Sequence, residues 1–194
     1  SSFRSTDTVL SHNVISTGYG GFYLSYLDAP LVKNNTLSGM STRGIYLYDC
    51  DGATTVTSNK LLSSNTQEGI YLNACDGSVI SGSSTVSNNF IQASRYGIHL
   101  EYSTYQDIYN NSVRLSGTNT GYRCFYLSQG GQVNVVNNIF ANAGGGYATE
   151  IRTPSAILSS DYNLLFTTGA SIGYWNSSAY EDLGSFQQAS GHEA

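Results

Sequence analysis

The chain has 194 residues and a formal net charge of −5, and only 11% of its residues are charged. Because Lys and Arg do not cluster, we expect neither nucleic acid nor an anionic membrane surface as a partner. No apolar run reaches the roughly 18 residues of a membrane-spanning helix, so we expect no membrane insertion.

An asparagine recurs at intervals of 22 to 30 residues, and an aliphatic or aromatic residue follows each copy within three positions. The seven copies are Asn13, Asn35, Asn59, Asn89, Asn111, Asn138 and Asn163. A period of this length is typical of a solenoid, whose repeats bury their apolar sides only against one another. Asparagine tolerates bridging or left-handed backbone at a corner, and its amide both donates and accepts hydrogen bonds. We therefore expect the seven copies to form a ladder along a rod.

A second repeated element has the form Gly-Ile-Tyr-Leu and follows five of the asparagines by 8 to 13 residues. Its copies span residues 21–24, 44–47, 69–72, 97–100 and 124–127. The alternation has a period of two, so Ile and Leu face one side of a strand and Tyr the other. Other segments, such as residues 53–61, are rich in β-branched residues. Short strands and a repeat near 25 residues predict coils of about three strands that stack into parallel sheets.

The last residues break the repeat and predict a helix. A Gly-rich turn is followed by residues 180–189, in which Leu183 and Phe186 share one helical face and acidic residues occupy the first turn. Gly191 is a suitable stop signal. We assign residues 1–166 to the repeats and 167–194 to a C-terminal turn and capping helix of the same domain. Residues 1–8 offer no similar cover, so we expect flanking domains or another chain to cap the N-terminal end.

The pattern Gly-Ile-Tyr-Leu followed by Val-x-x-Asn-x-Leu resembles the right-handed parallel β-helix repeats of the pectate-lyase-like superfamily over residues 8–166. The ending around Asn163, Trp175, Leu183 and Phe186 is similar to that of many secreted bacterial β-helix proteins. The resemblance implies an all-β, right-handed parallel β-helix (a solenoid) of about seven coils with a short C-terminal capping helix. It also implies a secreted or cell-surface protein, because members commonly act on or bind carbohydrate outside the cell.

The outward positions of the Gly-Ile-Tyr-Leu strands are expected to form one column along the rod. The column contains Tyr23, Tyr46, Tyr71, His99, Tyr126 and Glu150. A tyrosine offers an apolar ring with a polar tip, which suits the face of a sugar. We therefore predict carbohydrate binding by Tyr23, Tyr46, Tyr71 and Tyr126. The alternative is a purely structural ladder, because tyrosine is also favoured in strands.

A second hypothesis is catalysis by His99, Glu101, Glu150 and Arg152. Histidine ordinarily changes its charge near neutral pH, and Glu101 follows two residues later. Glu150 and Arg152 are expected two coils away, about 10 Å from His99, with Tyr126 between them. The alternative is that these are polar residues on a sheet. The Asp clusters with Arg or Lys bases of active pectate lyases, and the Asp-Pro-His-Asp motif of alginate epimerases, are not recognisable in the sequence.

A weak metal-site hypothesis concerns Asp49, Asp51 and Asp76. Asp51 and Asp76 each follow a Cys and precede a Gly, so stacking places them about 5 Å apart on adjacent coils. Such carboxylates suit a calcium ion or a retaining glycosidase. Asp-Gly is also a preferred turn dipeptide that needs no function. We predict no obligatory cofactor and leave calcium open.

Three cysteines give an odd count, and Cys50 and Cys75 occupy equivalent places in successive repeats. Stacking makes a disulfide between them sterically conceivable. The simpler expectation is buried thiols that pack as small apolar groups.

The favoured function is a secreted or surface module that is structural, carbohydrate-binding or both, with a polysaccharide or glycan as its partner. The alternative is a polysaccharide lyase or glycoside hydrolase acting on an extracellular polysaccharide. A purely architectural stalk is the third interpretation. The fold alone does not choose among them.

Overall fold

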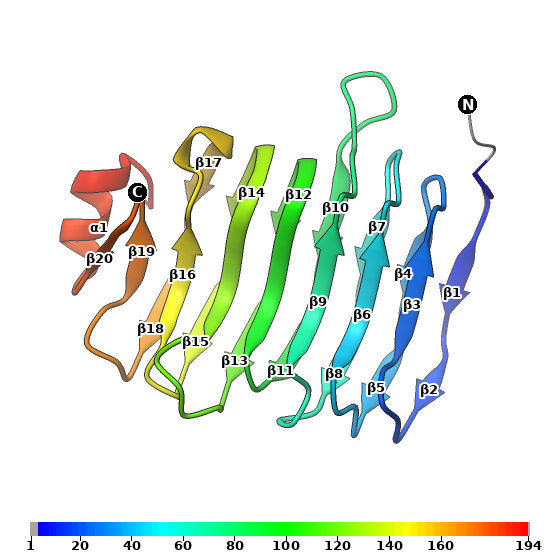
Figure 1. The fold of residues 1–194 in the computed structure, drawn as a ribbon, viewed down its shortest axis with the longest axis horizontal. Coiled ribbons are helices and arrows are strands. Elements are labelled where there is room, and N and C mark those ends of the chain that lie inside the picture. The colour runs from blue at the N-terminus through cyan, green and yellow to red at the C-terminus, as the bar shows by residue number, and fades with distance from the viewer. Residues whose placement is uncertain (1–3, 194) are drawn as a thin grey trace.

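The computed structural model describes residues 4–193 and confirms a parallel β-helix of about seven coils (Figure 1). One face of the solenoid is a parallel sheet of seven short strands, one from each coil. These strands are β2 (Val14–Ile15), β5 (Thr36–Ser38), β8 (Lys60–Leu62), β11 (Phe90–Ala93), β13 (Ser112–Leu115), β15 (Ile139–Asn142) and β18 (Leu164–Thr167).

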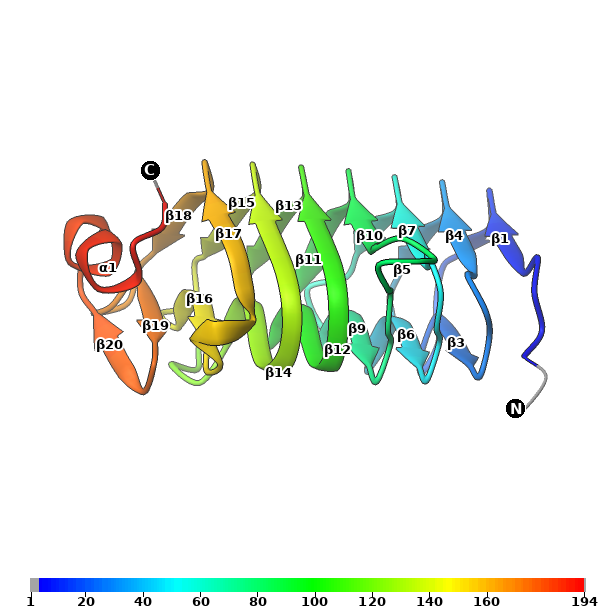
Figure 2. The same ribbon diagram turned by 90° about the horizontal axis from the view of Figure 1, so that it is seen from above.

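The other strands belong to a 13-stranded sheet that bends into two arms (Figure 2). The first arm contains β1 (Val9–Ser11), β4 (Leu31–Lys33), β7 (Thr55–Thr57), β10 (Ser84–Ser87) and β17 (Ile157–Asp161). The second arm contains β3 (Phe22–Ser25), β6 (Arg43–Tyr48), β9 (Glu68–Asn73), β16 (Tyr147–Ile151) and β19 (Gly173–Trp175). Two long strands, β12 (Tyr96–Tyr109) and β14 (Arg123–Val136), pass through both arms. The predicted three strands per coil are therefore present, although in two coils the arms are continuous.

The asparagine ladder is confirmed. In every step, the side-chain Nδ2 of one copy donates to Oδ1 of the next at 2.9 to 3.0 Å. Of the two backbone conformations expected for these asparagines, bridging and left-handed, the left-handed one was wrong, because positive φ values of 55° to 59° occur one residue earlier. The residues at those positions are His12, Asn34, Ser58, Asn88, Asn110, Asn137 and Tyr162. The turn is thus made by the preceding residue, and the asparagine that follows points its amide along the interior.

The ladder ends at Glu193, which takes the place of an eighth asparagine. Asn163 donates to Oε2 of Glu193 from its backbone N at 3.3 Å and from Nδ2 at 3.1 Å, and Ser160 donates its hydroxyl to Oε1 at 2.5 Å. Burial raises the pKa of the Glu193 carboxyl to about 7. The last amide of the ladder is therefore satisfied by a carboxyl group held in the interior.

The core consists of aliphatic columns that face inward from the three strands of each coil. Ile45, Ile70, Ile98 and Phe125 form one such column and are fully buried. The glycine that precedes each isoleucine is fixed by packing. A Cβ at Gly69 would lie 2.6 Å from the carbonyl oxygen of the next coil, and even nearer to a methyl group of the core. The Gly-Ile pairing of the repeat is therefore a requirement of close-packed coils.

The predicted capping helix is confirmed as α1 (Leu183–Ser190), at the opposite end from the N-terminus (Figure 1). Asp182 caps its first turn by accepting from Ser185 N at 2.8 Å, and Gly191 ends it with a φ of 72°. Phe186 is fully buried, whereas Leu183, predicted to lie on the same helical face, is 39% exposed. Strand β20 (Ser178–Tyr180) pairs antiparallel with β19 and covers that sheet edge.

A short 3-10 helix, η1 (Pro154–Ala156), precedes β17. No helix within residues 4–193 has both the length and the apolarity to cross a membrane.

The thiols of Cys50, Cys75 and Cys124 are free and buried, which agrees with the simpler expectation for the cysteines. The sequence predicted no cover from residues 1–8. Residues 1–3 of this segment lie outside the described range.

Candidate functional site

The outward column predicted from the sequence is present on the second arm. Strand register aligns its members in the order Tyr23, Tyr46, Tyr71, His99, Tyr126, Glu150 and Tyr174. Tyr174 is a seventh member that the repeat pattern did not reveal, because β19 lacks the Gly-Ile-Tyr-Leu sequence. We call this set the ring column.

The rings of the column stack on one another and so hide their own faces. The centroids of Tyr46 and Tyr71 are 4.8 Å apart at an interplanar angle of 9°, and those of Tyr71 and His99 are 4.3 Å apart at 9°. Tyr71 is 5% exposed and His99 7%, whereas Tyr23 at the end of the stack is 63% exposed. The expectation of an exposed column is therefore wrong in its middle. Tyr71 has no free ring face for a sugar.

A second row of side chains, three residues before the column member on β6, β9 and β12, covers the middle of the column. Arg43 places its guanidinium 4.4 Å from the ring centroid of Tyr46 and 5.1 Å from that of Tyr71. The ring of Tyr96 lies 5.2 Å from that of His99. This row explains why the middle of the column is buried although it faces outward.

Glu68 belongs to this row and is the buried carboxylate of the site. It accepts a hydrogen bond from Nε of Arg43, and its Oε1 lies 3.4 Å from Nδ1 of His99. Burial acts to raise the pKa of Glu68, but the hydrogen bonds with His99 and Arg43 outweigh it and hold the pKa below its usual value. Within the described part of the chain, Nε2 of His99 is buried without a hydrogen-bond partner. Sequence reasoning missed Glu68, although its place three residues before Tyr71, aligned with Arg43, was a usable signal.

The four residues predicted to be catalytic lie in two separate groups. His99 and Glu101 are on β12, and Glu101 accepts a hydrogen bond from the Tyr71 hydroxyl. Burial, followed by the hydrogen bond to Glu101, raises the pKa of Tyr71. On β16, Glu150 is 1% exposed and forms ion pairs with Arg123 and with Arg152. Because both carboxylates are already bound by neighbours, the catalytic role of these residues stays a prediction.

Arg4 pairs with two of the three aspartates of the predicted calcium site, which stays a prediction. Its Nη2 lies 2.6 Å from Oδ1 of Asp49 and 2.8 Å from Oδ2 of Asp51, so a guanidinium already neutralises this pair. Asp76 accepts from both the backbone N and the hydroxyl of Thr104 at 2.8 Å. Over residues 4–193, no group of three or more His, Cys, Asp or Glu side chains is arranged to hold a metal.

Soft metal donors also fail to converge. Cys50 and Cys75 lie on neighbouring coils, and their interaction lowers the pKa of Cys50 and raises that of Cys75. Both thiols also point at backbone carbonyl groups of the core. Cys124 and Met40 are buried elsewhere in the interior. The part of the chain that the structure describes therefore supplies two adjacent thiols but no third ligand beside them.

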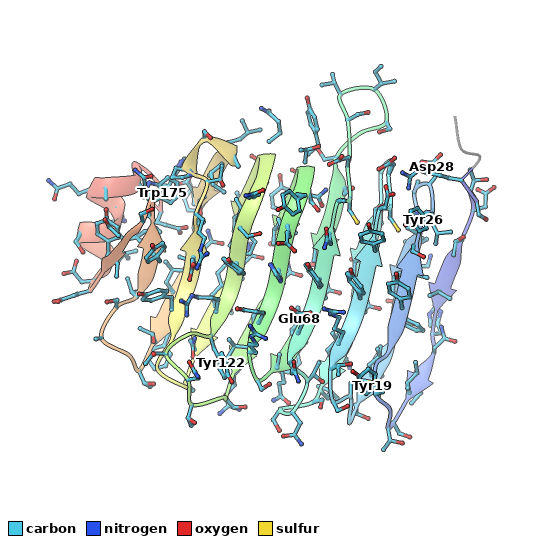
Figure 3. All side chains as sticks on the ribbon, viewed as in Figure 1. Tyr19, Tyr26, Asp28, Glu68, Tyr122 and Trp175 are labelled. Carbon is cyan, nitrogen blue, oxygen red and sulfur yellow. The ribbon has the colours of Figure 1, made fainter. Side chains whose placement is uncertain are left out.

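A continuous groove runs along the rod beside the ring column. Three neighbouring depressions, with volumes of about 380, 230 and 650 Å³, share residues of their lining. We call them together the axial groove and define it by Tyr19, Thr42, Arg43, Gln67, Arg95 and Tyr122. Figure 3 shows Tyr19 and Tyr122 at the same ends of the long strands, with Glu68 lying between them along the rod.

Backbone hydrogen bonds fix the members of the groove on successive coils. Thr42 N donates to Tyr19 O at 2.9 Å, and the residue after Gln67 donates to Thr42 O at 2.9 Å. The backbone N of the residue after Arg95 donates to Gln67 O at 2.8 Å. The backbone N of the residue after Tyr122 donates to Arg95 O at 2.9 Å. The turns that enter the second arm thus place one groove residue in each of five consecutive coils.

The lining of the axial groove combines aromatic, amide and cationic groups. Tyr19 is 81% exposed and stands beside Tyr23 at one end, and Tyr122 stands at the other. The side chains of Asn65 and Gln67 line the middle. Rings pack against apolar faces, and amides bind hydroxyl groups in either direction, so this lining suits a sugar chain. Sequence reasoning missed the groove because its residues lie in turns whose identities do not repeat.

Comparison with known proteins places the chain in a family. A search of curated proteins and a search of solved structures both found no match. One family model matches residues 3–143, which is well over half of the chain. The chain therefore belongs to the family described as periplasmic copper-binding protein (NosD).

Proposed function

We propose that this protein is a β-helix module of the cell envelope that binds a polysaccharide along the axial groove. The observation that carries the proposal is the continuity of the groove, which offers one lining residue in each of five successive coils. A ligand that follows the rod axis must itself be linear and repetitive, as a polysaccharide is. The description of the family as periplasmic supports a place outside the cytoplasm.

The tyrosines predicted to bind carbohydrate divide into two sets. Tyr23 and Tyr46 line the groove, and Tyr23, which is 63% exposed, remains the contact candidate, because Tyr46 is stacked between the rings of Tyr23 and Tyr71. Tyr71 and Tyr126 instead stack on either side of His99, with centroid distances of 4.3 and 4.7 Å. We assign these two to holding the wall of the groove rigid, because their faces pack against a neighbouring ring.

Hydrolysis or elimination on the same sheet is the second candidate function. It is favoured by the pairing of His99 Nδ1 with Glu68, which leaves Nε2 without a partner within residues 4–193. A histidine held in this way is arranged like a general base. Nε2 is buried beneath neighbouring rings, however, and a base must reach the proton that it abstracts. Binding is therefore the better supported function.

Copper is not part of this proposal, although the family description names it. Copper sites in proteins use converging thiolate, thioether or imidazole ligands. In the described residues, the two neighbouring thiols lack a third such ligand. Residues 4–193 therefore do not fit a copper centre.

The test is a binding measurement on the purified chain with a panel of linear neutral and acidic polysaccharides, by affinity electrophoresis and calorimetry. We expect binding to at least one polymer, and Tyr19→Ala and Tyr23→Ala to weaken it by about 3- to 10-fold. Tyr162→Ala is the matched control, because Tyr162 is 73% exposed and does not line the axial groove. Equal losses for all three variants, or no binding by the folded chain, would overturn the proposal.

The same samples decide between binding and catalysis. The chain is incubated with each polymer, with and without calcium, and new reducing or unsaturated ends are measured. Turnover that disappears in His99→Phe but persists in Tyr19→Ala would support the second candidate function.

A further inference from the structure

The loop between β9 and β10 presents two aliphatic side chains, Val79 and Ile80, which we call the aliphatic tip. Val79 is 82% exposed and Ile80 99%, the two highest values among the large apolar side chains of residues 4–193. The loop stands out beyond the ends of the long strands (Figure 1). Apolar surface that projects in this way, and that no other part of the described chain covers, indicates contact with another molecule.

The aliphatic tip is held in one conformation by hydrogen bonds at its base. Ser78 N donates to Gly82 O at 3.0 Å, and Gly82 N donates to Ser78 O at 2.9 Å. The Ser78 hydroxyl accepts from the backbone N of Ile80 at 3.2 Å and from that of Ser81 at 2.9 Å. Little backbone freedom is therefore lost when the tip binds, which favours a specific contact.

The corner of the solenoid from which the aliphatic tip projects is acidic. Asp76 lies at the base of the loop, and a backbone hydrogen bond of 2.9 Å joins its coil to that of Asp51. Asp51 pairs in turn with Asp28 on the first coil. Among residues 4–193, the only cation in an ion pair with these aspartates is Arg4, which Asp51 shares with Asp49. The surface at the base of the loop is therefore negative.

One end of the axial groove has complementary properties. Its depression of about 380 Å³ is lined by aromatic rings, among them Tyr19, Phe22 and Tyr23. Tyr19 is 81% exposed and Tyr23 63%, so the two rings are open to an aliphatic side chain. Arg43 lines the same depression, and its side chain stays 43% exposed although it pairs with Glu68.

Cations outnumber carboxylates along the groove. Arg43 and Arg95 line it, against the single carboxylate of Glu68. Arg95 forms none of the ion pairs found among residues 4–193. The groove is therefore positive, although the chain carries a net charge of −5. An acidic loop with an apolar tip fits this combination, whereas an anionic lipid surface would repel the acidic corner.

The aliphatic tip and the groove lie at opposite ends of the strands of the second arm. The loop follows the C-terminal end of β9, whereas Tyr19 comes before β3 and Tyr122 before β14, at the other ends (Figures 1 and 3). A chain therefore cannot place its tip in its own groove, but a second copy displaced along the strand direction can. Because the two patches differ, the contact is heterologous and can repeat from copy to copy without closing.

We propose that the aliphatic tip of one copy inserts between the exposed tyrosines at the Tyr19 end of the axial groove of a second copy, so that the rods associate side by side in an open row. The inference goes beyond the proposed function, because it assigns a protein partner and holds whether or not the groove also binds a glycan. The contact is small, so the association should be weak and depend on protein concentration.

Sedimentation velocity between about 5 and 500 μM measures the association of the wild-type chain. The tip variant is Val79→Ser/Ile80→Ser, and the groove variant is Tyr19→Ala/Tyr23→Ala. Leu158→Ser is the matched control, because Leu158 is 54% exposed but lies on β17, three strands along the sheet from β10. Circular dichroism verifies that each variant is folded.

We expect the average mass of the wild type to rise with concentration past that of a dimer, and about 0.5 M salt to reduce it. The tip variant and the groove variant should each weaken association by at least about 10-fold, and Leu158→Ser should leave it unchanged. An equimolar mixture of the tip variant and the groove variant should form a dimer and nothing larger. One keeps an intact groove and the other an intact tip, so a single contact remains between them.

A wild type that stays monomeric, a plateau at the dimer, or a mixture of the two variants that does not pair would overturn the inference. Equal weakening by Leu158→Ser would also overturn it. Flotation with vesicles of phosphatidylcholine and phosphatidylglycerol tests a membrane as the other occupant. Vesicle binding that is lost in the tip variant would assign the aliphatic tip to lipid and contradict the inference.

Discussion

Oε1 of Glu68 lies 3.4 Å from Nδ1 of His99, although 31 residues separate the two in sequence. The contact joins two neighbouring coils, because Glu68 pairs with Tyr96 in the strand register. It gives the buried carboxylate a partner on the ring column, in addition to Arg43 on the other side. Glu68 therefore links Arg43, which lines the axial groove, to His99, which stacks in the ring column.

Glu68→Gln is expected to destabilise the fold by about 1–3 kcal/mol at pH 7, because a buried charged acceptor is lost. The folded chain holds the pKa of Glu68 below its ordinary value of 4.5, so it binds fewer protons there than the unfolded chain. The stabilisation is thus present above pH 4.5 and is lost as the pH falls through the lower, folded-state pKa. Urea unfolding of both proteins between pH 3 and 7 measures the difference, which should shrink on the acid side.

The control for Glu68 is Glu181→Gln, because Glu181 is exposed at the C-terminal end. This change should stay within about 0.5 kcal/mol at every pH. A difference between wild type and Glu68→Gln that stays constant with pH would contradict the assignment of an ionised Glu68.

Asn89→Ala tests the ladder in its centre. Asn89 accepts from Asn59 and donates to Asn111, and it is 2% exposed. Removing its amide leaves buried donors and an acceptor without partners, so we expect a loss of about 2–4 kcal/mol in the free energy of unfolding. The neighbouring Asn88→Gly is the control, because Asn88 is exposed and has a φ of 56°, which glycine adopts without strain. Similar losses for the two variants would show that the turn, and not the ladder, matters.

Gly69→Ala tests the close approach of the coils. The added Cβ would lie 2.6 Å from Gly97 O and nearer still to Ile91 Cγ2, and the backbone oxygen cannot move without breaking the sheet. We expect a loss of more than about 2 kcal/mol or failure to fold. Gly131→Ala is the control, since its nearest neighbour would lie 3.7 Å away, and it should change stability by less than about 1 kcal/mol. Thermal melts of both variants give the comparison.

The fold was predictable because it depends on residues that repeat. The spacing from Asn59 to Asn89 contains an extra loop, yet the ladder passes through it unchanged. The alternation around Ile70 and Tyr71 was enough to predict which side chain faces the core. Parallel in-register stacking converts such a one-dimensional pattern directly into columns.

The candidate site was predictable only in part, because burial on the outer face depends on partners from other coils. The position of Tyr71 was predicted correctly, but the side chains of Arg43 and Tyr96 that cover this part of the column lie in other repeats. Arg4 pairs with Asp49 across 45 residues, and no local pattern announces this contact. Gln67 lies in a turn whose residue type varies from coil to coil, so periodicity gave no signal for the axial groove.

Glu193 makes the capped end of the rod sensitive to pH. Burial raises its pKa from 4.5 to about 7, so between these values the folded chain binds more protons than the unfolded chain. Stability should therefore fall as the pH rises from about 4.5 to about 7, by up to about 3 kcal/mol, and then level off. Glu193→Gln keeps an acceptor for Asn163 and cannot ionise, so its stability should lack this decline.

The measurement is urea unfolding of wild type and Glu193→Gln at half-unit steps from pH 4 to 8, with hydrogen exchange of the Asn163 amide as a local readout. The wild type should exchange faster at this amide as the pH rises, beyond the intrinsic base catalysis that Glu193→Gln reports. The effect of Glu68 on the free energy of unfolding has the opposite pH dependence and occurs below pH 4.5. The two variants, Glu68→Gln and Glu193→Gln, therefore separate the effects of the two carboxyl groups. Parallel stability curves for wild type and Glu193→Gln would show that folding leaves the pKa of this carboxyl near 4.5, so that above this pH the ladder ends on a charge.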